Sequence, residues 1–216
     1  MELEIQAAPQ KTFGEKLAKF ISYVFHPLLM PTYGFLALLF TKNYISTFTP
    51  LVLKIFLVGV TFVFTFIMPA INALILLRLK RIKTLEMENS EERYVPYIST
   101  ALFYFSLYYL FHTAGDFPSI FKLLILGAAI SILLTLIINL KWKISAHAIG
   151  IGGTVAAIIG ISFRLMIDLQ LIAIISILVA GLVGFARLKL NAHTPAQVYT
   201  GFLLGFLVEF ALMLFL

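Results

Sequence analysis

Long apolar segments are the feature that most constrains how this chain can fold. Short polar stretches separate apolar runs at residues 17–41, 51–78, 96–112, 118–140, 147–163, 169–186 and 195–216. Helices of this length match the hydrocarbon thickness of a bilayer, and a bilayer admits helices because they satisfy their own backbone groups. The sequence therefore predicts an all-α, polytopic helical membrane protein with six or seven transmembrane helices.

Composition excludes a soluble domain. Hydrophobic residues make up 61% of the 216-residue chain and charged residues 12%, and the mean hydropathy is +1.02. The apolar segments leave no room for a separate soluble unit, so residues 1–216 are expected to form one integral membrane domain. Residues 1–16 are polar and are expected outside the bilayer. They lack the apolar core and cleavage site of a removable signal peptide.

The basic charge balance is explained by the membrane. The formal net charge is +6 and the isoelectric point about 9.5. Positive residues that flank membrane helices, and anionic lipid headgroups, account for this balance without nucleic acid. Membrane lipids are therefore the expected partners. The chain has no cysteine, which excludes disulfides and thiolate chemistry.

The distribution of lysine and arginine predicts an orientation. If all seven segments span, the N-terminus and the loops at 79–95, 141–146 and 187–194 lie on one side. Of the 16 Lys and Arg residues, twelve fall toward that side and four toward the other, namely Lys42, Lys54, Lys122 and Arg164. Because positive residues accumulate inside, we expect these loops in the cytoplasm, at a bacterial inner membrane.

The last apolar segment begins with a helix-start pattern. Thr194-Pro195 fits an N-cap followed by proline at the first helical position, and Gln197 completes a capping box with Thr194. His193 is therefore expected just outside a helix N-terminus. Free backbone N–H groups and a partial positive charge make such a terminus attractive to an anion.

A second helix start carries another histidine. Ser145 fits an N-cap, which places His147 in the first turn of the fifth segment. Arg93, Arg187 and Lys143 lie in or beside the loops on the same predicted side. The sequence thus predicts a basic phosphate pocket at headgroup level, and shows no ligand set for a metal.

The spacing around His193 resembles that of the type-2 phosphatidic acid phosphatase superfamily. The third motif of that family is Ser-Arg-x5-His-x3-Asp. Arg187 and His193 keep this spacing, with Ala186 in place of the serine and Gln197 in place of the aspartate. The resemblance covers roughly residues 78–216.

The other two family motifs are matched in part. Ile144-Ser145-Ala146-His147 keeps the serine and histidine of Pro-Ser-Gly-His. Arg93-Tyr94-Val95-Pro96 separates the arginine and proline of Lys-x6-Arg-Pro, and Lys83 is the nearest upstream lysine.

The resemblance implies a metal-independent lipid phosphatase without a cofactor. His193 would be the nucleophile that forms a phosphohistidine, and His147 the general acid that protonates the leaving alkoxide. The phosphoryl oxygens would be bound by a set of cations and hydroxyl donors: Arg93, Arg187, Lys143, Lys83 and Ser145.

Gln197 admits two readings. As the counterpart of the family aspartate, its carbonyl can accept a hydrogen bond from His193 but supplies no charge. A divergent enzyme could use a loop carboxylate such as Glu91 or Glu92 instead. The other reading is that Gln197 is only the capping-box residue.

Two other functions stay open from the sequence. One is a catalytically degenerate relative that binds or moves phospholipid, and the other is a small anion transporter. For a phosphatase, undecaprenyl diphosphate, phosphatidic acid, phosphatidylglycerol phosphate and lipid A phosphate all fit as substrates.

Residues inside the apolar segments receive mostly structural interpretations. His26 and His112 are expected to serve packing or interfaces, and Lys141 and Lys189 to be interfacial anchors. Gly150-Ile151-Gly152-Gly153 and Gly201-x-x-x-Gly205 are expected to permit close helix packing. Glu209, an ionisable residue deep in the last segment, is a candidate for function.

Overall fold

The protein is a bundle of helices. The computed structural model describes residues 12–215 apart from 86, 88, 90 and 116, and within those residues it contains helices and no strand. The all-α prediction is confirmed. The α-helices are α1 (Phe13–Val24), α2 (Met30–Phe40), α3 (Tyr44–Phe48), α4 (Leu51–Phe62), α5 (Met68–Arg78), α6 (Tyr94–Thr113), α7 (Ser119–Asn139), α8 (Ala146–Leu165), α9 (Gln170–Lys189) and α10 (Pro195–Phe215).

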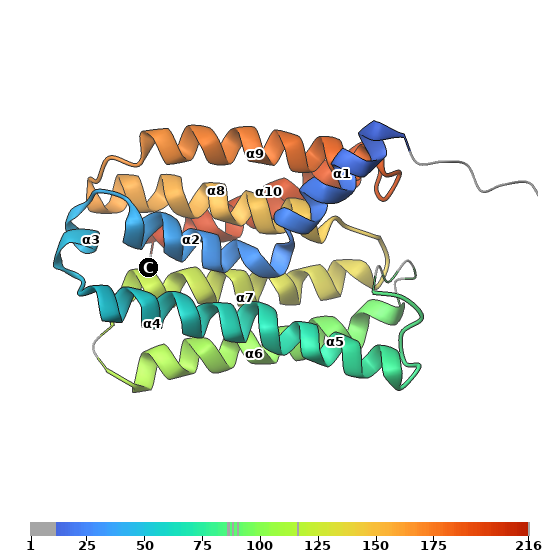
Figure 1. Cartoon of the computed structure of the whole chain (residues 1–216), viewed down its shortest axis with the longest axis horizontal. Helices are drawn as coiled ribbons and strands as arrows, with labels where there is room; N and C mark the ends of the chain where they lie inside the picture. The colour runs from blue at the N-terminus through green and yellow to red at the C-terminus, as the bar shows by residue number, and fades with distance from the viewer. Residues whose placement is uncertain (1–11, 86, 88, 90, 116, 216) are drawn as a thin grey trace, which may run out of the picture.

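Six helical stretches in the described part of the chain are long and apolar enough to cross a membrane. They are Phe13–Phe40, Leu51–Arg78, Ser119–Asn139, Ala146–Leu165, Gln170–Lys189 and Pro195–Phe215. The helix predicted at 96–112 exists as α6 and is 20 residues long. Its tyrosines lower its hydropathy, so it is not one of these six, although it runs the length of the bundle beside α7 (Figure 1).

Proline interrupts the first two stretches. The helix predicted at 17–41 begins earlier, at Phe13, and breaks after Val24. The 3-10 turn η1 (Pro27–Leu29) then leads into α2. In the second stretch the wide turn η2 (Val63–Ile67) precedes Pro69, which has no N–H for a regular helical bond. The first stretch is thus broken at His26-Pro27, between α1 and η1.

The helices form two layers, and the loops with the candidate motifs share one end of the bundle (Figure 1). The start of α1 and the loops that follow α5, α7 and α9 lie at this end, which we call the motif end. The loops that follow α2, α6 and α8 lie at the opposite end. This arrangement agrees with the alternation that the sequence predicted.

Glycines hold α8 and α10 together, as the sequence predicted. A Cβ atom at Gly201 would lie 2.9 Å from the backbone oxygen of Ser145. Cβ atoms at Gly152 and Gly205 would overlap the backbone oxygens of Phe202 and Ile149. The two helices therefore run side by side with their backbones nearly touching, which fixes the start of α8 against α10.

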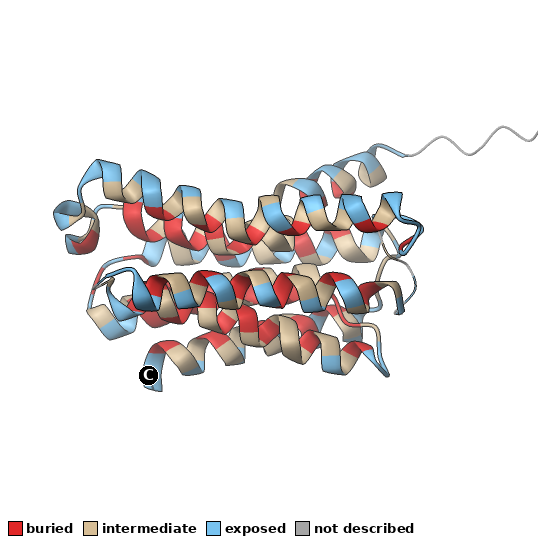
Figure 2. Ribbon diagram, turned by 90° about the horizontal axis from the view of Figure 1, so that it is seen from below, coloured by how far each residue is buried: buried red, intermediate tan, exposed pale blue. Residues whose placement is uncertain are grey.

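Apolar side chains cover the outside of the bundle. Figure 2 shows exposed residues on the outward faces of the helices and buried ones between the layers. Leu171 and Leu178 on α9 are 71% and 65% exposed, and many other large apolar residues are also exposed. A surface of this kind suits lipid chains, which supports placing the bundle in a membrane.

Candidate functional site

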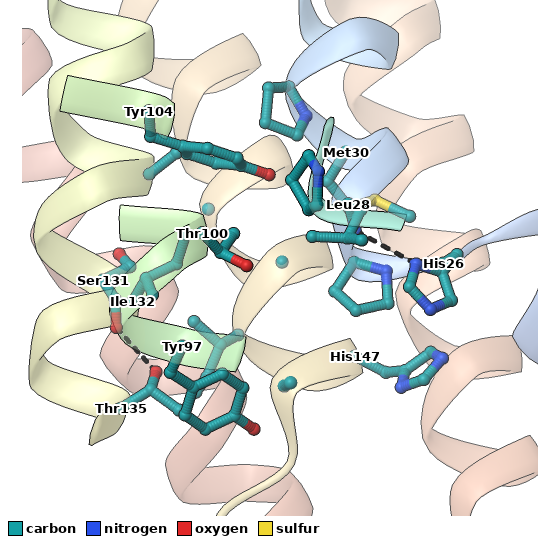
Figure 3. A pocket seen from close by; sticks show the side chains of 18 of the residues that line it. His26, Leu28, Met30, Tyr97, Thr100, Tyr104, Ser131, Ile132, Thr135 and His147 are labelled. Atoms are coloured by element: carbon teal, nitrogen blue, oxygen red, sulfur yellow. Dashed lines mark hydrogen bonds between the residues drawn. The ribbon is translucent and has the colours of Figure 1, made fainter. Parts of the chain in front are cut away.

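A cavity of about 240 Å³ lies inside the bundle and reaches the motif end. We call it the central cavity. Figure 3 shows His26 and His147 on one side of it, and Tyr97, Thr100 and Tyr104 of α6 with Ser131 and Thr135 of α7 on the other. At its mouth the lining includes Arg93, Arg187 and His193, and at its inner end Glu209. Apolar residues such as Leu28, Met30 and Ile132 make up much of the remaining wall.

His193 is oriented by Gln197. The Oε1 atom of Gln197 lies 3.1 Å from the Thr194 backbone N–H and 3.1 Å from His193 Nδ1. Because the backbone N–H can only donate, Oε1 must accept, and the His193 nitrogen that faces it must carry the proton. Neutral His193 therefore keeps its lone pair on Nε2, where a nucleophile needs it.

Gln197 serves two purposes at once. The Thr194 hydroxyl accepts a hydrogen bond from the Gln197 backbone N–H at 3.4 Å, which completes the predicted capping box. The same glutamine side chain holds the imidazole of His193. Gln197 is therefore not a capping residue alone, because its one amide oxygen accepts both hydrogen bonds.

The surroundings of His193 keep its imidazole neutral. Burial lowers its pKa to about 4, and the positive charge of Arg187 adds to this effect. Lys143 and Arg93 lower the pKa further, while the hydrogen bond with Gln197 raises it. At neutral pH the ring is thus unprotonated on Nε2 and sits among cations that can bind an anion.

Ser22 of α1 joins Arg187 to His147. The Arg187 guanidinium donates from Nη1 to the Ser22 hydroxyl at 3.2 Å, and His147 Nε2 lies 3.1 Å from the Ser22 backbone oxygen. Since a carbonyl oxygen only accepts, His147 donates from Nε2, and its Nδ1 is left for other partners. Nε of Arg187 is buried and has no hydrogen-bond partner among the described residues.

His26 lies beside His147, which the sequence interpretation did not anticipate. The two ring centroids are 5.5 Å apart, and both rings line the central cavity. Nδ1 of His26 accepts from the Leu28 backbone N–H at 3.3 Å, so its Nε2 carries the proton when the ring is neutral. The signal for this placement was the proline break, since interrupted membrane helices line cavities.

Arg93 is held at the cavity mouth from the start of α6. Its side chain is 7% exposed, and Nε donates to the Met87 backbone oxygen at 2.8 Å. The structure thus brings Arg93, Arg187, His147 and His193, four of the predicted site residues, to one cavity.

The other predicted residues lie around this group. Lys143 and Gln197 line a shallow depression outside the cavity, and His193 borders both spaces. Ser145 is fully buried and caps α8 by accepting from the Ala148 N–H at 3.4 Å. It lines neither space. Lys83 is exposed and also lines neither.

Neither of the loop carboxylates Glu91 and Glu92 lies beside His193 in the cavity or the depression. Glu92 accepts from the Lys83 backbone N–H at 3.2 Å and from the Asn89 side chain at 3.3 Å. Glu91 is exposed, and neither glutamate lines the cavity or the depression. Gln197 is the hydrogen-bond partner that the described structure gives to His193.

His112 lies apart from the site, and the described residues form no metal-binding group. His112 is exposed and stacks on Tyr108, with ring centroids 6.1 Å apart, outside the central cavity. Among residues 12–215, omitting the four undescribed positions, no three His, Cys, Asp or Glu side chains gather as a metal-binding group.

These features define a polytopic membrane protein with a basic, histidine-lined cavity open to one end of its bundle. No protein-family model, curated protein or solved structure matches the chain.

Proposed function

We propose that this protein is a metal-independent membrane lipid phosphatase that works through a phosphohistidine, as expected from its resemblance to type-2 phosphatidic acid phosphatases. One observation carries the proposal. Neutral His193, with Nδ1–H held by Gln197, lies at the mouth of a cavity that Arg93 and Arg187 also line. A nucleophile with its lone pair free, next to cations that bind phosphoryl oxygens, has the parts that phosphoryl transfer needs.

In the first step Nε2 of His193 attacks phosphorus while the bond from phosphorus to the lipid oxygen breaks. The phosphorylated imidazole of His193 is positively charged, and the hydrogen bond from its Nδ1–H to the Gln197 oxygen stabilises that charge. Arg93 and Arg187 stabilise the charge on the phosphoryl oxygens. His147 enters this step as the imidazolium, gives its Nδ1 proton to the leaving alkoxide and becomes neutral.

In the second step water attacks phosphorus and the bond between phosphorus and His193 breaks. His147, now neutral, takes a proton from that water, and inorganic phosphate leaves. Because Nε2–H of His147 is donated to the Ser22 backbone oxygen, Nδ1 is the atom that would exchange the proton. Ser22 therefore has a positioning role for both His147 and Arg187.

The cavity supports a lipid substrate. A soluble phosphate ester would gain little from apolar walls such as Leu28, Met30 and Ile132, whereas part of a lipid would bury its surface there. The proposed substrate is a lipid phosphate or diphosphate whose headgroup sits at the motif end.

A second candidate is a degenerate relative that binds or transports phospholipid or another anion. The neutral amide of Gln197 favours it, because the carboxylate that the family places here would stabilise a positively charged histidine better. This candidate predicts binding or flux without release of phosphate.

Phosphate release from a panel of lipids tests the proposal. The protein purified in detergent should release inorganic phosphate from at least one of phosphatidic acid, phosphatidylglycerol phosphate, undecaprenyl diphosphate and lipid A phosphate. Release should persist with a chelator, since the proposed chemistry uses Arg93 and Arg187 as its cations. Vanadate, which mimics five-coordinate phosphorus, should inhibit.

The outcomes separate the two candidates. A strict requirement for magnesium would exclude the phosphohistidine mechanism. Binding of these lipids with no release from any of them would favour the degenerate relative.

We further propose that the protein lies in a bacterial inner membrane with its motif end facing the cytoplasm. Most of the lysine and arginine residues of the chain lie toward that end. The chain has no cysteine, so single ones can be introduced. Thr84→Cys at the motif end should resist an impermeant thiol reagent on intact cells, while Thr47→Cys at the opposite end should react. The reverse labelling would place the site outside the cytoplasm.

A further inference from the structure

Two buried polar atoms without hydrogen-bond partners lie at opposite ends of the central cavity. Nε of Arg187, near the mouth, is a donor, and Oε1 of Glu209, at the inner end, can accept a hydrogen bond. Neither has a partner within the described part of the chain. Buried polar groups are normally paired, so each of these atoms requires an explanation. The mechanism above uses Arg187 and leaves Glu209 without a task.

Glu209 lies deep in the bundle. It is 4% exposed and lies about 21 Å along α10 from Pro195 at the usual helical rise. A Cβ atom at Gly153 would lie 4.0 Å from the Cβ of Glu209, and Gly153 follows His147 by about 9 Å along α8. The carboxyl is thus well below the histidines, at membrane depth, where ionisable groups usually serve function.

The chain makes room for this carboxyl. A Cβ atom at Gly127 of α7 would overlap Oε2 of Glu209, so the absence of a side chain at Gly127 is what seats the carboxyl against α7. Any larger residue at position 127 would push the carboxyl away.

The nearby wall offers hydrogen-bond acceptors. The hydroxyl of Thr100 donates to the Pro96 oxygen at 2.7 Å, and that of Tyr104 to the Thr65 oxygen at 3.3 Å. The hydroxyl of Thr135 donates to its own helix, at 2.6 Å from the Ser131 oxygen. Because these three protons are committed, the hydroxyl oxygens of Thr100, Tyr104 and Thr135, which line the cavity (Figure 3), can only accept from a ligand.

We propose that the inner end of the central cavity is a binding subsite in which Glu209 accepts a hydrogen bond from a hydroxyl or amino group on the lipid. The ligand would thus carry an anionic phosphate at the mouth and a donor group well down its chain, at the depth of Glu209. This inference rests on the proposed phosphate site, and it narrows the substrate class. Plain polyprenyl phosphates lack such a donor, whereas lipids with a hydroxyl or amino group along the chain have one.

Binding of phosphonates tests the subsite without turnover. The probes are single-chain alkyl phosphonates that each carry one hydroxyl, moved stepwise from the carbon next to phosphorus toward the chain end. The unsubstituted alkyl phosphonate is the reference. The full-length protein in detergent should bind one mid-chain hydroxyl isomer about tenfold more tightly than the reference, because a buried acceptor gains its partner.

Variants connect that preference to Glu209. Glu209→Leu should abolish the preference, and Glu209→Gln, whose amide oxygen still accepts, should retain part of it. Gly127→Ala should weaken it by displacing the carboxyl. Leu207→Ala is the matched control, since Leu207 is 62% exposed on the same helix. If Glu209→Leu fails to fold, binding of the isomer series to the wild type and to Glu209→Gln still tests the subsite, because the preference should be present in the wild type and reduced in Glu209→Gln.

The outcomes are distinguishable from those of the phosphatase assay. Equal binding of all isomers and the reference by the wild type, or a preference unchanged in Glu209→Leu, would overturn the subsite even if phosphate is released. A clear positional preference that Glu209→Leu removes would establish the subsite even if no lipid is hydrolysed.

Discussion

Replacing His193 with alanine should abolish phosphate release, with kcat reduced at least about 10⁴-fold, because the proposed nucleophile is lost. The helix start should survive, since the Thr194 hydroxyl and the Gln197 side chain still cap α10 without the imidazole. The measurement is steady-state release from the best lipid of the panel, together with thermal unfolding of both proteins.

Trapping of the intermediate accompanies this assay. Wild type mixed briefly with lipid labelled in its phosphate should yield an acid-labile phosphoprotein, and His193→Ala should yield none. His112→Ala is the matched control, because His112 is exposed and lies outside the cavity. Normal turnover by His193→Ala would rule out the proposed mechanism.

The sequence predicted the parts of the site that depend on local pattern. The helix start at Thr194-Pro195 and the Ser145 cap follow from residue types at fixed spacings. Both caps are present, so the places of His193 and His147 at helix starts were predictable. The close packing of α8 on α10 was also readable, because small residues at regular spacing indicate it.

The remaining parts depend on tertiary packing that no spacing reveals. Ser22 joins Arg187 to His147 only because α1, which ends before the helix interruption at His26-Pro27, packs against α9. His26 faces His147 for the same reason. Lys83 is the nearest lysine before Arg93 in the sequence, which predicted a role for it in phosphate binding. The path of the loop leaves its side chain exposed instead. The alternating direction of successive helices determines at which end of the bundle a loop lies. It does not determine which side chains of that loop point into the central cavity.

The sequence alone could not decide between two roles for the side chain of Gln197. A capping role and a role toward His193 looked like alternatives, because each assigns the side chain one partner. The structure satisfies both, since a carbonyl oxygen has two lone pairs. The cap thus places the amide where it selects the tautomer of His193.

Replacing Arg187 with alanine should lower kcat/KM for the best lipid by about 10²- to 10³-fold, because a charged donor to the phosphoryl oxygens is lost. Arg187→Lys keeps the charge but loses Nε and the planar fork, so it should restore activity only in part. Both variants also lose or weaken the bond to the Ser22 hydroxyl, so unfolding temperatures should be measured alongside.

The pH profile separates an electrostatic role of Arg187 from a merely structural one. Arg187 helps to lower the pKa of His193 to about 4, so the wild type should keep a reactive neutral imidazole down to that pH. Without the cation the pKa of His193 should rise toward its ordinary value. Protonation would then remove the Nε2 lone pair at a higher pH, and the acid limb of kcat/KM should move upward in Arg187→Ala. Arg187→Lys should shift it less, because a positive charge remains. An acid limb that stays in place in Arg187→Ala, in a protein that remains folded, would show that Arg187 does not act on His193 through its charge.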